Sequence, residues 1–134
     1  MAFKTIIKIE PVAKGRPRST IQGGKIWTYN PDRTQVAEET IRAFLSEYKE
    51  TIFPQHAPLK LTVTFYRTKS KWLPKRETLP FRRPDLDNLL KLLLDAINHI
   101  LIPDDAQITS IETKKRWSTK SYGYIELTLE NDCF

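Results

Sequence analysis

The stretch Arg82-Arg83-Pro84-Asp85-Leu86-Asp87-Asn88-Leu89-Leu90-Lys91 decides how we interpret the rest of the chain. Asp85 and Asp87 are two residues apart, so an extended backbone would place both carboxylates on the same side. Pro84 favours an extended backbone at its own position and at the residue before it. The stretch therefore predicts a pair of aspartates that act together.

A helical pattern begins directly afterwards and predicts a helix from Asn88 to Asn98. We expect Asp87 to be its N-cap and Lys91 to lie one turn later on the same side. At about 100° per residue, the polar side chains share one stripe: Asp87, Asn88, Lys91, Asp95, Asn98 and His99. The other residues are mostly leucine, isoleucine and alanine, so we expect burial on most sides. The polar stripe would then line a site beside the core.

A third aspartate follows the predicted helix. That helix would be about 16 Å long at about 1.5 Å per residue. The seven residues from His99 to Asp105 can span up to about 23 Å when extended. We therefore expect Asp105 to reach the first two aspartates, provided that the helix stops near Asn98. Such a stop is plausible because Asn and His tolerate left-handed backbone.

Three carboxylates beside a lysine would suit a hard divalent cation such as Mg²⁺, which prefers oxygen ligands and often lies next to substrate phosphate. We therefore predict that Asp85, Asp87 and Asp105 bind a metal. The structural alternative is a turn residue, a helix cap and a surface turn at Asp104-Asp105. The spacing of the whole set, with Lys91 and an apolar helix between its members, favours the metal site.

The runs Arg83–Lys91, Leu94–Asn98 and Asp104–Ile108 closely resemble the RusA-type Holliday junction resolvases. Their signature looks like Pro-Asp-x-Asp-Asn-Leu-x-Lys, then Asp-Ala-Leu, then Asp-Asp-Ala-Gln. The resemblance implies that Asp85, Asp87 and Asp105 are metal-binding catalytic aspartates and that Lys91 is the catalytic lysine. His99 departs from the pattern, since many members carry glycine there, and this bears on the shape of the helix exit rather than on the chemistry.

The same resemblance implies a Mg²⁺-dependent endonuclease, with Mn²⁺ able to replace Mg²⁺, that resolves four-way DNA junctions by paired nicks. It also implies a homodimer, which agrees with the approximate two-fold symmetry of a four-way junction. Two other classes stay open. One is a non-catalytic nucleic-acid binding module with a structural acidic cluster, and the other is a metal-dependent nuclease that acts on flaps or RNA.

Length and charge fit this interpretation. The chain has 134 residues, which suits a single domain over 1–134 with a real core, and its formal net charge of +6 favours an anionic partner. Apolar runs stay well short of the roughly eighteen residues of a membrane span, so we expect no membrane partner. The single Cys133 fits a reducing compartment. We expect a cytoplasmic, nucleoid-associated protein.

Two basic segments are candidates for DNA contact. The first is the loop 14–19, and the second is the long, proline-rich loop from Arg67 to Pro84, which also carries Trp72 and Phe81. Basic side chains interleaved with aromatic rings suit phosphate contact and base stacking. A solvated charged loop is the alternative. The predicted DNA-binding residues are Lys14, Arg16, Arg18, Lys69, Lys71, Arg82 and Arg83.

The pattern along the chain predicts an α+β domain in which a single mixed β-sheet has two main helices packed against it, as in RusA. The predicted strands are Phe3–Val12, Lys25–Tyr29 after a Gly23-Gly24 turn, Leu59–Arg67, and a closing hairpin of Ile108–Trp117 with Tyr122–Glu130. The first helix should open at Asn30-Pro31 and run to about Lys49. Its predicted apolar face is Val36, Ile41, Phe44, Leu45 and Tyr48.

Overall fold

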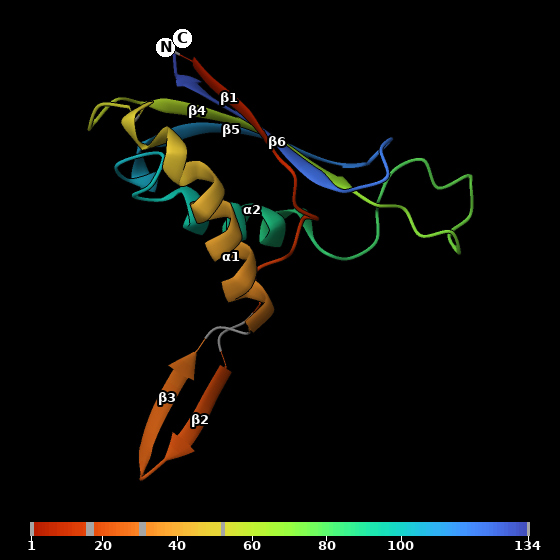
Figure 1. The fold of residues 1–134 in the computed structure, drawn as a ribbon, viewed down its shortest axis with the longest axis horizontal. Helices are drawn as coiled ribbons and strands as arrows, with labels where there is room; N and C mark the ends of the chain where they lie inside the picture. Colours follow the sequence, from red (N-terminus) through yellow and green to blue (C-terminus); the bar gives the residue numbers. More distant parts are fainter. Residues whose placement is uncertain (1, 16–17, 30–31, 52, 134) are drawn as a thin grey trace.

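A computed structural model describes residues 2–15, 18–29, 32–51 and 53–133. For 18–20, 22, 26–29, 32 and 49–51, the description covers the backbone alone. The chain forms two layers, a four-stranded mixed sheet and a pair of helices that cover one of its faces (Figure 1). The predicted α+β class, with one mixed sheet and two main helices, is confirmed. None of the helices in the described residues is long and apolar enough to cross a membrane.

The elements follow the predicted order with some shifted ends and with one strand, β2, that was not predicted. They are β1 (Ala2–Ile7), β2 (Arg18–Gln22), β3 (Lys25–Tyr29), α1 (Asp32–Leu45), the 3-10 helix η1 (Ser46–Thr51), β4 (Leu59–Arg67), α2 (Leu86–Ile97), the 3-10 helix η2 (Asp105–Gln107), β5 (Ile108–Trp117) and β6 (Tyr124–Asn131). The bounds of β3 and β4 are those predicted. The first strand stops at Ile7 instead of Val12, and α1 tightens into η1 before Lys49. The predicted Asn30-Pro31 helix start lies outside the described residues.

The strand order β1-β6-β4-β5 makes β4 a central strand. It pairs antiparallel with β6 and parallel with β5. The predicted hairpin of the last two strands is therefore wrong, because β4 lies between them. Burial explains the order. Alternate residues of β4 and β6 are buried, whereas β5 has no fully buried residue and takes the edge of the sheet.

The strands β2 and β3 form a separate two-stranded ribbon that projects away from the sheet and helices (Figure 1). Its turn is Gly23-Gly24, with φ angles of 58° and 77°. A two-residue turn with positive φ at both positions suits glycine, which has no Cβ to clash. The predicted turn is confirmed.

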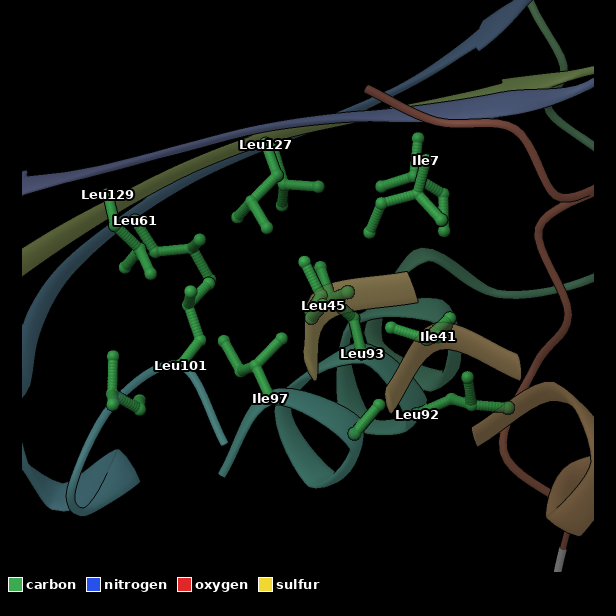
Figure 2. Packing of buried hydrophobic residues seen from close by; sticks show 14 of the residues in the cluster. Ile7, Ile41, Leu45, Leu61, Leu92, Leu93, Ile97, Leu101, Leu127 and Leu129 are labelled. Carbon is green, nitrogen blue, oxygen red and sulfur yellow. The ribbon is translucent and has the colours of Figure 1, made fainter. Parts of the chain in front are cut away.

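The core lies between the inner face of the sheet and the two helices. Figure 2 shows Leu93 and Ile97 of α2 packed below Leu127 of β6. Ile41 and Leu45 of α1 are buried beside them, as predicted. Val36 is 60% exposed, contrary to the prediction, and Ala37 is buried instead. The reason is spacing: residues 37, 41 and 45 recur every four positions and so share one face of α1.

We expect Leu93→Ala to lower the free energy of unfolding by about 2–5 kcal/mol, because Leu93 is 0% exposed at the centre of the core. The matched control is Leu79→Ala, at a leucine that is 52% exposed, which should change stability by less than about 0.5 kcal/mol. Urea unfolding of both variants at one protein concentration measures the difference. Equal losses in the two variants would contradict the described core.

Candidate active site

The first turn of α2 places the two neighbouring aspartates. Asp85 is the N-cap, with extended φ and ψ of −71° and 144°, and its carbonyl oxygen accepts from the amides of Asn88 and Leu89 at 3.2 and 3.1 Å. The prediction that Asp87 would be the N-cap is wrong, because the helix starts as soon as the extended segment set by Pro84 ends. The Asp85 side chain makes no capping hydrogen bond, and both carboxylates are exposed. They are therefore available to a ligand.

Lys91 lies one turn after Asp87, as predicted, and is exposed. A helix lysine at this spacing commonly pairs with an acid one turn away. Within the described part of the chain, no ion pair joins Lys91 to either Asp87 or Asp95. Asp95 is instead bound by Lys14, whose Nζ lies 2.9 Å from its Oδ2. Lys91 and Asp87 thus lie on the same side of α2, and both are exposed.

An open hollow of about 380 Å³ lies beside Asp85. It is lined by Ala13, Arg83, Pro84, Asp85 and Asn88. The amide of Lys14 donates to the carbonyl of Asn88 at 2.9 Å, which holds the segment after β1 against the start of α2. The hollow therefore offers both a carboxylate and a guanidinium at its rim.

The far end of α2 is closed by a tight turn. The helix stops at Ile97 with Asn98 as its C-cap, and His99 follows with a φ of 64°. This confirms the predicted stop, with His99 as the left-handed residue. The amide of His99 donates to the carbonyl of Ile102 at 2.8 Å, and its Nδ1 lies 2.6 Å from the carbonyl oxygen of Pro103. The chain therefore folds back on itself instead of extending.

Asp105 stays at this far end, because its amide donates to Oδ1 of Asn98 at 3.0 Å. The prediction that it returns within the same chain to Asp85 and Asp87 is wrong. The residues needed for an extended return are used in the turn after His99. Across the described ranges, no three His, Cys, Asp or Glu side chains gather closely enough to hold a metal. One chain therefore carries two acidic groups, at opposite ends of α2.

The acidic group around Asp105 is electrostatically crowded. Burial, then the neighbouring Asp104 and Asp95, raise the pKa of Asp105 above its usual value. The pKa of Asp104 is lowered, mainly because the amide of Ala106 donates to its carboxylate at 3.0 Å. Carboxylates that resist ionising together gain from a cation nearby. This end of α2 therefore gathers carboxylates that a nearby cation would stabilise.

Lys115, which the sequence interpretation did not single out, supports the residues before Asp85. Its Nζ donates to the carbonyls of Arg82 and Pro84, both at 2.8 Å. Burial lowers its pKa, and Arg67 acts in the same direction while Asp85 opposes it. Strand alternation is the sequence signal that could have identified Lys115, because it places Lys115 on the opposite face from the basic residues on either side of it.

Several predicted DNA-binding residues hold the protein itself together. Lys14 binds Glu38 at 2.6 Å as well as Asp95, which links α1 to α2. Burial lowers the pKa of Lys14, but these two carboxylates outweigh it and the net shift is upward. Lys69 Nζ donates to the carbonyl of Glu77 at 2.8 Å. These cations already bind carboxylate or carbonyl groups of the protein itself.

Arg82 also binds a group of the protein itself, because its guanidinium donates to both carboxylate oxygens of Glu77, at 2.5 and 3.2 Å. By contrast, Lys71 and Arg83 are exposed. Arg16 lies outside the described residues, and the side chain of Arg18 is not described. Of the predicted set, Lys71 and Arg83 are therefore the described cations best placed to meet phosphate.

Comparison with known proteins leads to one family. The sequence model of the family described as Endodeoxyribonuclease RusA matches residues 8–130. The uncharacterised protein YqaN of Bacillus subtilis (strain 168) is 32% identical over 120 residues, which cover 81% of this chain and 83% of YqaN. The crossover junction endodeoxyribonuclease rusA of Lactococcus phage r1t is 36% identical over 110 residues, covering 78% and 79% of the two chains. The family match includes both ends of α2.

We expect Lys115→Ala to loosen the chain before Asp85, because two carbonyls lose their donor at a cost of about 1–3 kcal/mol. Amide hydrogen exchange across residues 80–86 should become faster. The control is Lys114→Ala, since Lys114 is the exposed neighbour on the same strand. If both variants exchange like the unmodified protein, Lys115 does not anchor this segment.

Proposed function

The chain belongs to the RusA family of endodeoxyribonucleases, and from this premise we propose that it resolves four-way DNA junctions by paired, divalent-metal-dependent nicks. One observation carries the proposal. Asp85, Asp87 and Lys91 are all exposed along the first turns of a helix whose opposite face is buried. The relative from Lactococcus phage r1t, named as a crossover junction endodeoxyribonuclease, supports this substrate.

The residues present fit a hard divalent cation. Asp85, Asp87 and Asp105 would hold Mg²⁺, with Mn²⁺ able to take its place, because these ions favour carboxylate oxygens. Burial and then the acidic neighbours raise the pKa of Asp105, and a cation bound there would offset the repulsion between these carboxylates. When bound, such an ion lowers the pKa of a coordinated water and neutralises charge on a phosphate.

Lys91 would stabilise the negative charge that grows on the scissile phosphate, or orient the attacking water. It lies on the same side of α2 as Asp87, and within the described residues no ion pair joins it to Asp87 or Asp95. Arg83, at the rim of the hollow beside Asp85, would hold a neighbouring phosphate. The expected products are nicks with 5′-phosphate and 3′-hydroxyl ends.

The protein would act as a homodimer in which each site is shared. Within one chain, Asp85 and Asp105 flank a helix of 12 residues, which is about 18 Å long. A two-fold axis that sets two copies of α2 antiparallel would bring Asp85 and Asp87 of one subunit to Asp105 of the partner subunit. A dimer would then have two complete sites, one for each of two opposed strands of a junction.

The direct test is cleavage of a labelled four-way junction, a flap and a linear duplex side by side, with and without Mg²⁺. Metal-dependent nicking of the junction ahead of the other substrates is the expected result. Binding without cleavage under any metal would identify a binding module instead. Cleavage of the flap alone would identify a different nuclease.

We expect Asp85→Asn and Asp105→Asn each to abolish cleavage while junction binding is retained, since each change removes a metal ligand that also repels phosphate. Mixing the two inactive proteins should restore nicking of one strand, because a shared arrangement leaves one intact site in each heterodimer. Glu112→Gln, at an exposed carboxylate of β5, should behave like the unmodified protein. A mixture that stays inactive, although heterodimers form, would place each site within one chain.

We expect Lys91→Ala to slow single-turnover cleavage at saturating Mg²⁺ by about a hundredfold or more, as electrostatic stabilisation of a transition state is commonly worth that much. Dimerisation and metal affinity should change little. If Lys91 only formed an ion pair with Asp87 or Asp95 on the helix surface, it would stabilise the helix by only about 0.5 kcal/mol. A folded, dimeric Lys91→Ala protein that cuts nearly as fast as the unmodified one would therefore reduce Lys91 to a surface residue.

A further inference from the structure

We propose that the loop from Thr68 to Pro84 is a preformed DNA-binding arm, in which Trp72 stacks on the exposed face of a nucleobase at a branch point. The inference rests on the proposed function and extends it to how branched DNA is distinguished from linear DNA. The arm projects beyond the end of the sheet (green, right side of Figure 1).

The arm is folded although it contains no helix or strand. Its interior is built around Glu77, whose carbonyl accepts from Lys69 Nζ at 2.8 Å and from Trp117 Nε1 at 3.1 Å. The Glu77 carboxylate binds Arg82, and this hydrogen bond lowers the pKa of Glu77. These contacts cross-link the two sides of the loop, so its shape exists before any ligand arrives.

Both ends of the arm are hydrogen-bonded to other parts of the fold. At the first end, the amide and hydroxyl of Thr68 donate to the two carboxylate oxygens of Glu10, each at 3.0 Å. Gly123 makes room for that carboxylate, because a Cβ there would lie 1.7 Å from Glu10 Oε2. At the other end, Lys115 holds the carbonyls of Arg82 and Pro84. The arm is thus fixed relative to Asp85.

Trp72 lies on the outer surface of this folded arm. It is 92% exposed, and Phe81 and Leu79 are 72% and 52% exposed. A turn holds Trp72 in place, since its amide donates to Ser70 Oγ and the amide of Leu73 to the Ser70 carbonyl, both at 3.2 Å. A rigid segment that displays a large aromatic ring and two more apolar side chains indicates a binding surface.

The charge around these rings points to nucleic acid as the partner. Lys71, Lys75, Arg76 and Arg83 are exposed on the arm. The single acidic residue between 68 and 84 is Glu77, which Arg82 neutralises. An open hollow of about 540 Å³ beside Phe81 is lined in part by Arg76 and Leu79. DNA supplies phosphates that the cations can bind and base faces on which the aromatic rings can stack.

Stacking on Trp72 requires a base whose face is free. Inside a continuous duplex, both faces of each base are covered by its neighbours. At a branch point or an unpaired base, one face is open, and an aromatic side chain can cover it regardless of sequence. Trp72 would therefore add affinity for branched DNA and little for a perfect duplex.

The test measures binding without divalent metal to three probes: a four-way junction, a duplex with unpaired thymines and a perfect duplex. Trp72→Ala should weaken binding to the first two probes by about tenfold and leave the third unchanged. Trp72→Phe should keep most of the affinity, because it keeps a flat ring. Trp72→Leu should lose the affinity for these two probes, because leucine is apolar and bulky but has no flat ring.

The controls separate stacking from other effects. The slope of log affinity against log salt should not change in Trp72→Ala, because no phosphate contact is lost. Val36→Ala, at a residue of α1 that is 60% exposed, should bind all three probes like the unmodified protein. Unchanged thermal midpoints would confirm that the variants fold.

Undiminished binding by Trp72→Ala, or an equal loss on the perfect duplex, would overturn the inference. An unmodified protein that does not distinguish unpaired bases from perfect duplex would overturn it as well. The proposed function is tested separately, by metal-dependent cleavage. If binding to unpaired bases depends on the Trp72 ring but the junction is not cleaved, the DNA-binding role of the arm is supported and the resolvase proposal is wrong.

Discussion

Burial of the apolar face of α2 is the constraint on which the candidate site depends. Leu89, Leu93 and Ile97 are almost completely buried, and each such side chain stabilises the fold by about 1.5–3 kcal/mol. Their burial fixes the rotation of the helix about its axis. That rotation in turn decides that Lys91 is exposed rather than turned into the core. The core thus orients the side chains of the candidate site without contacting them.

What the sequence could predict was local. The alternation of β4, the paired glycines at 23–24 and the left-handed His99 are each decided by residues close in the chain. The order of the strands was not predictable in this way, because β5 pairs with β4, a strand distant in the chain, and not with β6, which follows it. The same holds for Asp105, since a tight turn and an extended return are both compatible with the sequence after His99.

The basic residues illustrate a second limit of sequence interpretation. A formal net charge of +6 suggests a uniformly DNA-binding surface, yet Lys14, Lys69, Arg82 and Lys115 bind carboxylates or carbonyls of the protein itself. Burying a cation is costly unless it is paired or hydrogen-bonded. Such residues mark where the fold is held together, and the exposed cations mark where an anion can approach.

The two ends of α2 and the arm at 68–84 suggest how cleavage would be restricted to the right DNA. A site shared between subunits, as proposed, would make nicking depend on assembly, because each chain holds its two acidic groups at opposite ends of α2. The arm adds a second condition. Lys115 connects its final residues to the start of α2, so a base stacked on the arm and a phosphate beside Asp85 would occupy positions fixed by one rigid segment. Recognition of the branch and placement of the scissile bond would then follow from the same contacts.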